Sequence, residues 1–265
     1  MGKNAPRPVD GGRSIDWGKT SQDYSIYRPG PPESFYRKLL ALDVGLGRQR
    51  ILDLGTGTGV LARQFAKQGA VAAGIDISGE QIQAAKILAE AEDLRVDFRV
   101  APAEQIPFPD GSFEIITANQ CWLYFDKTKT IPEVNRLLVK DGLLVTSHFT
   151  WLPRRDRLAA ASEELVLKHN PQWSAADYGG QVGPLPKWAE GIFYVKAFFH
   201  YDEPIHFTRD TWKGRIRACR GIGAALGPED VQRFDEAHDR LLRSIAGEEF
   251  TVLHQIGCHM FTFRT

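Results

Sequence analysis

The stretch from Ile51 to Gly59 constrains the fold more than any other part of the chain. It reads ILDLGTGTG, an apolar run that suits a short buried strand, followed by a turn with glycine at every second position. Helical spacing of apolar residues begins directly after the turn, at Val60. Glycines let the backbone turn sharply and approach a ligand, and the N–H groups at a helix N-terminus favour a negative charge. The pattern therefore predicts a strand, a turn and a helix that hold a nucleotide-like cofactor at the carboxyl edge of a parallel sheet.

The spacing of the glycines distinguishes between two kinds of cofactor. A dinucleotide fingerprint requires the order G-x-G-x-x-G. Gly55 and Gly57 fit its first two positions, but Val60 stands at the third. The third glycine comes earlier, at Gly59, and Asp53 precedes the whole turn. A nicotinamide dehydrogenase is therefore the less favoured interpretation.

The core of the chain alternates between segments with strand and helix patterns. We expect strands at 50–54, 71–75, 95–101, 113–118 and 142–149, and helices at 59–68, 79–92 and 127–138. Strands that alternate with helices are typical of a parallel sheet with helices on both faces.

Segments of this core resemble, in order, the motifs of the class I S-adenosylmethionine-dependent methyltransferases. They are the glycine turn, Val71–Asp76, Ala101–Phe108, Gly111–Ala118 with the Asn119–Trp122 segment after it, and Leu137–Val145. The pieces A-E-x-I-P-F and F-E-x-I resemble the methyltransferase type 11-like group, whose members act on small molecules and include ubiquinone-type C-methyltransferases. Asp141 departs from the pattern, because proline is common there. The resemblance implies in-line transfer of a methyl group from S-adenosyl-L-methionine to a small-molecule acceptor, which leaves S-adenosyl-L-homocysteine.

The resemblance also implies the complete α/β architecture. We expect a Rossmann-like, doubly wound, mostly parallel seven-stranded sheet with a C-terminal antiparallel hairpin, whose arms lie near residues 195 and 257. Residues 1–44 are then an N-terminal segment with a lid helix, and 45–150 are the core that binds the methyl donor. Residues 151–265 are a helical and aromatic substrate-cap insertion after the fifth strand, with the closing strands of the same domain.

The residues that the resemblance assigns to the donor lie mainly at the ends of strands. They are Tyr27 and Arg28 in the lid; Asp53, Gly55, Thr56 and Gly57 around the methionine moiety; Asp76 on the ribose hydroxyls; Ile77, Ala103 and Glu104 beside the adenine; and Asn119 and Gln120 near the transferring methyl. The position of Asp76 supports its role independently, since a carboxylate about twenty residues past the turn commonly accepts hydrogen bonds from ribose. The alternative is that Asp76 only helps to begin the next helix.

The acceptor side is less specific. Trp122, Tyr124 and Phe125 are candidates to line the acceptor pocket, although aromatic residues after a strand often pack in the core. His148 ends the fifth expected strand at the same edge of the sheet, so it is the candidate catalytic base. The alternative for His148 is a histidine that is hydrogen-bonded within the packing of the insertion.

Composition and charge narrow the class of partner. Lys plus Arg equals Asp plus Glu, 33 each, and this balance argues against a nucleic acid, which usually requires a basic excess. No apolar run approaches the length that spans a membrane, so we expect no membrane partner. The chain has only 3 cysteines, scattered and odd in number, which fits a reducing cytoplasmic setting.

Some features point weakly to other functions. His254, Cys258 and His259 are metal-binding residue types, but the histidines have opposite parity on a predicted strand, so we expect no metal. A basic run of Lys213, Arg215, Arg217 and Arg220 is most simply a solvated helix face, and the alternative is that one arginine binds an acidic acceptor. An RNA or protein methyltransferase, and a protein that binds the donor without catalysis, stay open as alternative functions.

Overall fold

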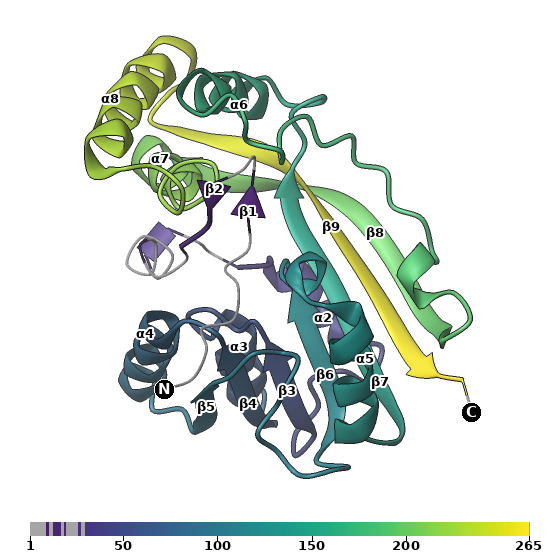
Figure 1. Cartoon of the computed structure of the whole chain (residues 1–265). Coiled ribbons are helices and arrows are strands. Elements are labelled where there is room, and N and C mark those ends of the chain that lie inside the picture. Colours follow the sequence, from purple (N-terminus) through teal and green to yellow (C-terminus); the bar gives the residue numbers. More distant parts are fainter. Residues whose placement is uncertain (1–8, 11–12, 17–18, 20–25, 28–29, 265) are drawn as a thin grey trace. The chain divides into compact units, whose positions relative to one another are not determined.

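A computed structural model describes residues 9–10, 13–16, 19, 26–27 and 30–264 (Figure 1). The strands are β1 (Val9–Asp10), β2 (Arg13–Ser14), β3 (Arg50–Leu54), β4 (Val71–Asp76), β5 (Val96–Val100), β6 (Phe113–Asn119), β7 (Leu138–Trp151), β8 (Phe193–Thr208) and β9 (Glu249–Phe263). The helices are α2 (Glu33–Leu40), α3 (Val60–Lys67), α4 (Gly79–Ala91), α5 (Lys127–Leu137), α6 (Arg157–His169), α7 (Arg209–Arg217) and α8 (Pro228–Ile245). Short 3₁₀ turns form at η2 (Trp122–Tyr124) and η3 (Lys187–Ala189).

The chain divides into two compact units, and each is built from separate segments. Unit 1 comprises Met1–Pro29, Thr150–Gln181 and Asp202–Gln255. Unit 2 comprises Gly30–Phe149, Val182–Tyr201 and Ile256–Thr265. The division into 1–44, 45–150 and 151–265 stays a prediction about the roles of those segments.

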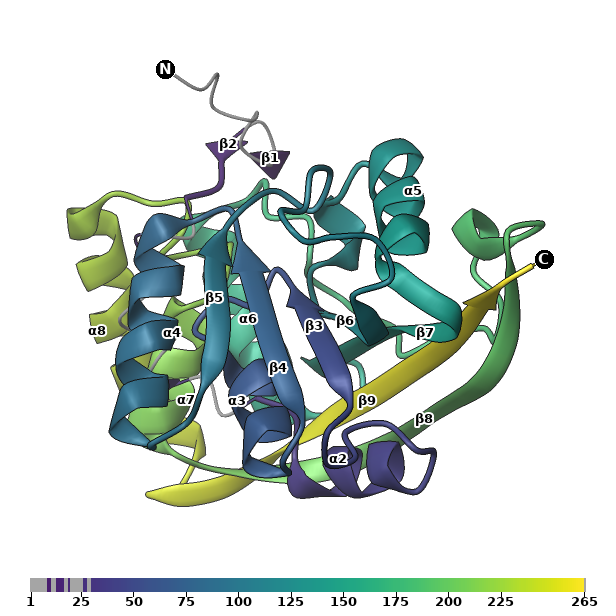
Figure 2. The same cartoon turned by 90° about the horizontal axis from the view of Figure 1, so that it is seen from below.

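A 7-stranded sheet has the order β5-β4-β3-β6-β7-β9-β8. The pairs β3–β4, β3–β6, β4–β5 and β6–β7 are parallel, and the C-terminal strands are antiparallel, which confirms the expected fold class. Every residue of β3 after Arg50 is buried, as expected for a central strand covered on both faces. The helix α3 packs on β3 and β4, and α4 packs on β4 and β5 (Figure 2).

The strand β7 begins earlier than the sequence predicted. Its first residue, Leu138, pairs with Phe113, and the regular pairing resumes only at Leu143 opposite Ile115. Asp141 lies between these pairs with a φ of 62°, so residues 139–141, which separate the expected helix from the expected strand, form an irregularity within the strand rather than a turn. The parallel pairing on either side holds the segment in the sheet, which overrides its local turn pattern.

Unit 1 carries the helices α6, α7 and α8 around an apolar cluster of its own. Trp212 and Ile216 of α7 are fully buried, as are Phe234 and Leu242 of α8. Arg215 of α7 is also buried, at 3% exposure, so the prediction of a solvated basic face is wrong at that position. None of the helices described is both long and apolar enough to cross a membrane.

Candidate functional site

The glycine turn between β3 and α3 has the left-handed backbone that its sequence predicts. Gly55, Gly57 and Gly59 have φ angles of 56°, 55° and 77°, where a side chain is strained. Thr56 N donates to the Ile75 carbonyl at 2.8 Å, and Gly59 N donates to the Thr56 carbonyl at 2.9 Å. These two N–H groups precede α3 and stabilise the turn itself, and the binding of a negative charge at the N-terminus of α3 stays a prediction.

Asp76 holds the end of β4 against this turn. One carboxylate oxygen accepts a hydrogen bond from Gly57 N at 2.9 Å, and the other accepts from Ser78 N at 2.9 Å. Burial raises the pKa of Asp76, although these backbone donors oppose the shift. The bond to Ser78 fits the alternative that Asp76 helps to begin α4. Each oxygen keeps a further lone pair, so the carboxylate can also accept from a ligand hydroxyl.

Asp53 is the buried acid of the site, with 3% exposure. Its two oxygens accept hydrogen bonds from the hydroxyls of Thr56 at 2.7 Å and Thr117 at 2.6 Å. Thr117 is directly opposite Asp53 in the parallel pair of β3 and β6, so the strand register brings them together. Burial raises the pKa of Asp53 to about 6, against the opposing effect of both hydroxyls. The site therefore contains a carboxyl group that titrates near neutral pH.

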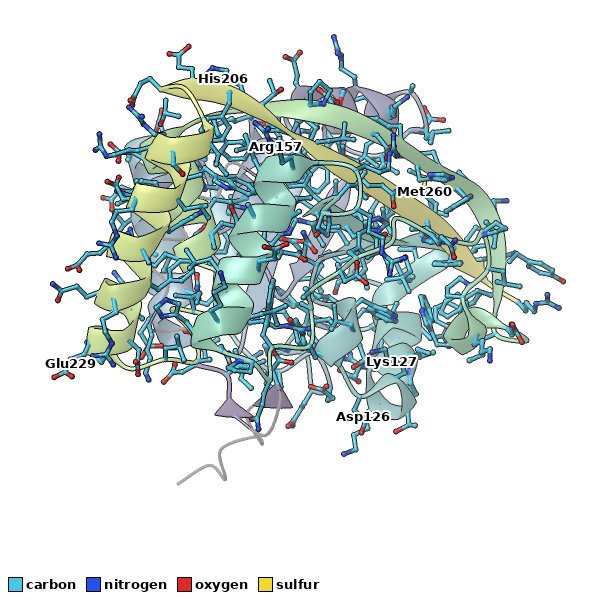
Figure 3. The ribbon with its side chains drawn as sticks, turned by 90° about the horizontal axis from the view of Figure 1, so that it is seen from above. Asp126, Lys127, Arg157, His206, Glu229 and Met260 are labelled. Atoms are coloured by element: carbon cyan, nitrogen blue, oxygen red, sulfur yellow. The ribbon has the colours of Figure 1, made fainter. Side chains whose placement is uncertain are left out.

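The residues expected beside the adenine lie in different environments. Ile77 is 49% exposed directly after β4, as an apolar contact surface would require. Ala103 is buried. Glu104 accepts a hydrogen bond from Asp126 N at 2.9 Å. Asp126 lies immediately before α5, which begins at Lys127 (Figure 3). One oxygen of Glu104 is thus engaged in holding the start of α5.

Asn119 and Gln120 bind the neighbouring strand β7. The Asn119 side-chain oxygen accepts from the Ser147 hydroxyl at 3.0 Å, and Gln120 N donates to the Ser147 carbonyl at 2.8 Å. The Gln120 side-chain amide donates to the Phe149 carbonyl. Gln120 has a φ of 65°, a strained conformation for a residue with a side chain. The structure therefore gives both residues a part in fixing the sheet edge, and their contact with the transferring methyl stays a prediction.

The aromatic residues after β6 divide between core and turn. Trp122 is buried, with its ring centroid 5.0 Å from that of Trp188 and 5.9 Å from that of Phe125. This packing fits the alternative that Trp122 is a core residue. Phe125 is partly buried, and a Cβ added to Gly55 would lie 3.3 Å from its ring. Phe125 therefore lies against the glycine turn, whereas for Trp122 and Tyr124 the acceptor pocket stays a prediction.

Cys121 is a residue of the site that the sequence reasoning missed. Its thiol donates to the Leu54 carbonyl at 3.0 Å, and a Cβ added to Gly55 would lie 2.9 Å from its Sγ. Its position directly after Asn119 and Gln120 was the available signal, since all three lie at the carboxyl end of the same strand.

His148 is partly buried on β7 and packs on the backbone of β9. A Cβ added to Gly257 would lie 2.0 Å from the Cε1 atom of the imidazole, so only glycine admits the ring there. Sequence reasoning selected His148 but not Gly257, which lies far along the chain. The structure brings the histidine into the unit that carries Asp53 and Asp76, and its catalytic role stays a prediction.

The expected lid is only partly described. Tyr27 lies in unit 1, where its ring packs on Gly214 of α7 and its centroid is 5.4 Å from the Arg217 guanidinium. Arg28 lies outside the described residues. The contact of this segment with a cofactor stays a prediction.

The histidines considered as metal ligands have other contacts. His254 Nδ1 is 2.9 Å from the Val252 carbonyl, and His259 Nε2 is 2.8 Å from the Gly183 carbonyl. Across the part of the chain that the structure describes, no group of three His, Cys, Asp or Glu side chains is placed to hold a metal ion.

Comparison with known sequences agrees with the motif order. Residues 52–146 match the profile of the family described as "Methyltransferase domain". Demethylmenaquinone methyltransferase from Thermus thermophilus is 38% identical over 119 residues, which cover 43% of this chain and 54% of that protein. The ubiquinone/menaquinone biosynthesis C-methyltransferase UbiE from Citrifermentans bemidjiense is 34% identical over 124 residues, which cover 43% and 52%. The chain thus spans about half the length of the curated relatives it matches.

Solved structures show the same fold over most of the chain. A putative type II methyltransferase from Anaeromyxobacter dehalogenans has a TM-score of 0.59 at 20% identity and covers 89% of this chain and 97% of its own. A methyltransferase from Thiobacillus denitrificans, solved with S-adenosyl-L-homocysteine, has a TM-score of 0.54 at 19% identity and covers 94% and 98%. Residues 52–146 are thus similar to a methyltransferase domain family, and the chain has the fold of the class I S-adenosylmethionine-dependent methyltransferases.

Proposed function

We propose that the chain is an S-adenosyl-L-methionine-dependent methyltransferase that acts on a small-molecule acceptor. The observation that carries the proposal is the link between the glycine turn and Asp76. The turn lets a ligand approach the backbone closely, and the Asp76 carboxylate at its side keeps lone pairs for the ribose hydroxyls. The residues present thus fit the methyl donor, and we propose the positions given above for its methionine, ribose and adenine parts.

The donor supplies an activated methyl group when bound, so the chain's own residues have mainly to bind and orient the reactants. Asp53 places a carboxylate for the donor's ammonium group, and Phe125 and Cys121 cover the glycine turn. His148 is the proposed base for an acceptor that must lose a proton, and Gly257 gives its ring room. We also propose that the reaction needs no metal.

The balanced charge of the chain favours a small acceptor over RNA, and the pieces A-E-x-I-P-F and F-E-x-I favour it over a protein substrate. Two relatives are named for quinone methylation, which supports a small acceptor of some kind here. We further propose a cytoplasmic location. Cys121, Cys219 and Cys258 all lie in described segments and carry no disulfide bond, as a reducing compartment would require.

Isothermal titration calorimetry on the full chain tests the proposal. We expect saturable binding of S-adenosyl-L-methionine and S-adenosyl-L-homocysteine and no binding of NAD, because Val60 replaces the third glycine of the dinucleotide turn. Incubation with a methyl-labelled donor and a panel of small acceptors then separates an enzyme from a non-catalytic binder. Tight binding of NAD without binding of either adenosyl ligand would contradict the proposal.

The raised pKa of Asp53 predicts how donor affinity depends on pH. The donor's ammonium is attracted by a carboxylate but not by a carboxylic acid, so affinity should be constant well above pH 6. Below the folded-state pKa of about 6 it should fall about tenfold per pH unit. Calorimetry with S-adenosyl-L-homocysteine between pH 5 and 8 measures this, and Asp53→Asn should remove the dependence. Equal affinity at pH 5 and pH 8 in the parent protein would exclude the role.

The raised pKa of Asp53 affects folding stability with the opposite pH dependence from donor affinity. The folded chain keeps the Asp53 proton up to about pH 6, whereas the unfolded chain releases it near the usual value of 3.8. The contribution of Asp53 to stability is therefore present below pH 3.8 and is lost as pH rises toward 6.

A further inference from the structure

Arg215 of α7 is a buried cation without an ionic partner. Its side chain is 3% exposed, and its Nε atom has no hydrogen-bond partner among the residues described. Within the same described segments, no carboxylate lies within ion-pair distance of its guanidinium. A charge removed from water without a partner is strongly unfavourable, so this arrangement calls for an explanation.

The other basic residues of the run differ from Arg215 in this respect. Lys213 contacts Asp239 at 3.1 Å, Arg217 contacts Asp235, and Arg220 contacts Asp10 at 3.4 Å. The carboxylates of Asp239, Asp235 and Asp10 thus pair with the other basic residues of the run and not with Arg215. The arginine in the middle of the run is left with an unmatched positive charge.

The guanidinium of Arg215 packs on an aromatic ring and makes no ion pair with a described carboxylate. The guanidinium carbon lies 4.8 Å from the centroid of the Trp151 ring, a cation–π contact that offsets only part of the burial. Glu163 is buried in the same unit, but it accepts hydrogen bonds from Trp151 Nε1 at 2.5 Å and from Asp177 N at 2.7 Å. Each of its two oxygens thus already accepts one hydrogen bond, and neither forms an ion pair with Arg215.

The positive charge of Arg215 affects the pKa of His254. Burial and the positive charge of Arg215 together lower its pKa to about 3, against the opposing hydrogen bond with the Val252 carbonyl, so the imidazole is neutral at physiological pH. Burial also lowers the pKa of Arg215 itself, to about 10, which leaves the guanidinium protonated. An anion is the component that this cluster of Arg215, Trp151 and His254 lacks.

We propose that Arg215 binds the carboxylate of a small acidic ligand, so that unit 1 contains an anion site of its own. The planar fork of a guanidinium matches the two oxygens of a carboxylate. One unmatched positive charge suits a monoanion, whereas a phosphate dianion would require a second cation, and Lys213, Arg217 and Arg220 are already paired. This anion site does not depend on the proposed function.

The test uses the full chain, with benzoate as the probe anion and benzamide as its neutral isostere. Calorimetry should show saturable benzoate binding, with benzamide and inorganic phosphate at least tenfold weaker. Arg215→Met should weaken benzoate binding at least tenfold, and Arg215→Lys should give an intermediate affinity because it keeps the charge but loses the fork. Arg209→Met is the matched control on α7, since Arg209 pairs with Glu248 away from this cluster and its loss should leave benzoate affinity unchanged.

Thermal unfolding separates a ligand-binding arginine from a structural one. Arg215→Met should keep or raise the melting temperature, because it removes a buried unpaired charge. A lowered melting temperature would overturn the proposal, as would unchanged benzoate binding in Arg215→Met, phosphate binding as tight as benzoate, or no saturable benzoate binding by the parent. S-adenosyl-L-homocysteine affinity is measured on the same samples. Its absence in the parent would refute the proposed function, whereas loss of benzoate binding alone refutes only the anion site.

Discussion

Gly55→Ala should weaken S-adenosyl-L-homocysteine binding more than tenfold and destabilise the fold by about 2–4 kcal/mol. Two costs add. The φ of 56° at Gly55 is strained for alanine, and the new Cβ would lie 2.8 Å from the Cβ and 2.9 Å from the Sγ of Cys121. Both atoms belong to the segment after β6, so the turn has to move away from it. A displaced turn no longer presents the close backbone approach that we propose for the donor.

Gly111→Ala is the matched control. Gly111 has a similar φ of 61°, but an added Cβ there meets nothing within 4 Å. The control should cost only about 1–2 kcal/mol, from backbone strain, and should leave donor affinity unchanged. Chemical denaturation and calorimetry on both variants measure the two effects. Equal donor affinity in the two variants would show that the glycine turn does not contact the donor.

Asp76→Ala should weaken S-adenosyl-L-homocysteine binding by about 10–100-fold, because buried ribose hydroxyls would lose their acceptor at a cost of about 1–3 kcal/mol. The structure adds a second effect. The N–H groups of Gly57 and Ser78 would lose their acceptor too, so folding should be destabilised by about 1–3 kcal/mol. The variant should therefore remain folded but melt at a lower temperature.

Asp97→Ala provides the comparison for Asp76. Asp97 lies on the neighbouring strand β5, where its half-exposed carboxylate pairs with Arg99 at 2.6 Å. Loss of such a surface pair should cost at most about 1 kcal/mol and should not affect the donor. Calorimetry on a folded Asp76→Ala sample decides the assignment: affinity equal to that of Asp97→Ala would remove Asp76 from the site.

The architecture of unit 2 was largely readable from local patterns. Buried strands such as β3 are mostly apolar, and the glycine turn fixes where the helix α3 begins. Each of these signals lies within a few residues of the feature it predicts. The start of β7 was not predicted correctly, because it depends on the pairing of Leu138 with Phe113, which is distant in the sequence.

The candidate site was less predictable, because its details depend on contacts between distant segments. The sequence suggested Asp76 as a ribose ligand but not as the acceptor for Gly57 N. Gly257 was missed because its only signal is the imidazole of His148 on another strand. Arg215 was expected on a solvated face, since helical spacing alone does not reveal which side of α7 faces the apolar cluster of unit 1.

The position of Cys121 has a consequence for self-modification. A sulfonium donor is an alkylating agent, and a thiolate beside it would be methylated in place of the acceptor. Burial raises the pKa of the Cys121 thiol well above its usual range, and the negative charges of Asp53 and Asp76 raise it further. The sulfur thus stays protonated and donates to the Leu54 carbonyl. The acids proposed to hold the donor would in this way also protect the protein from its own reagent.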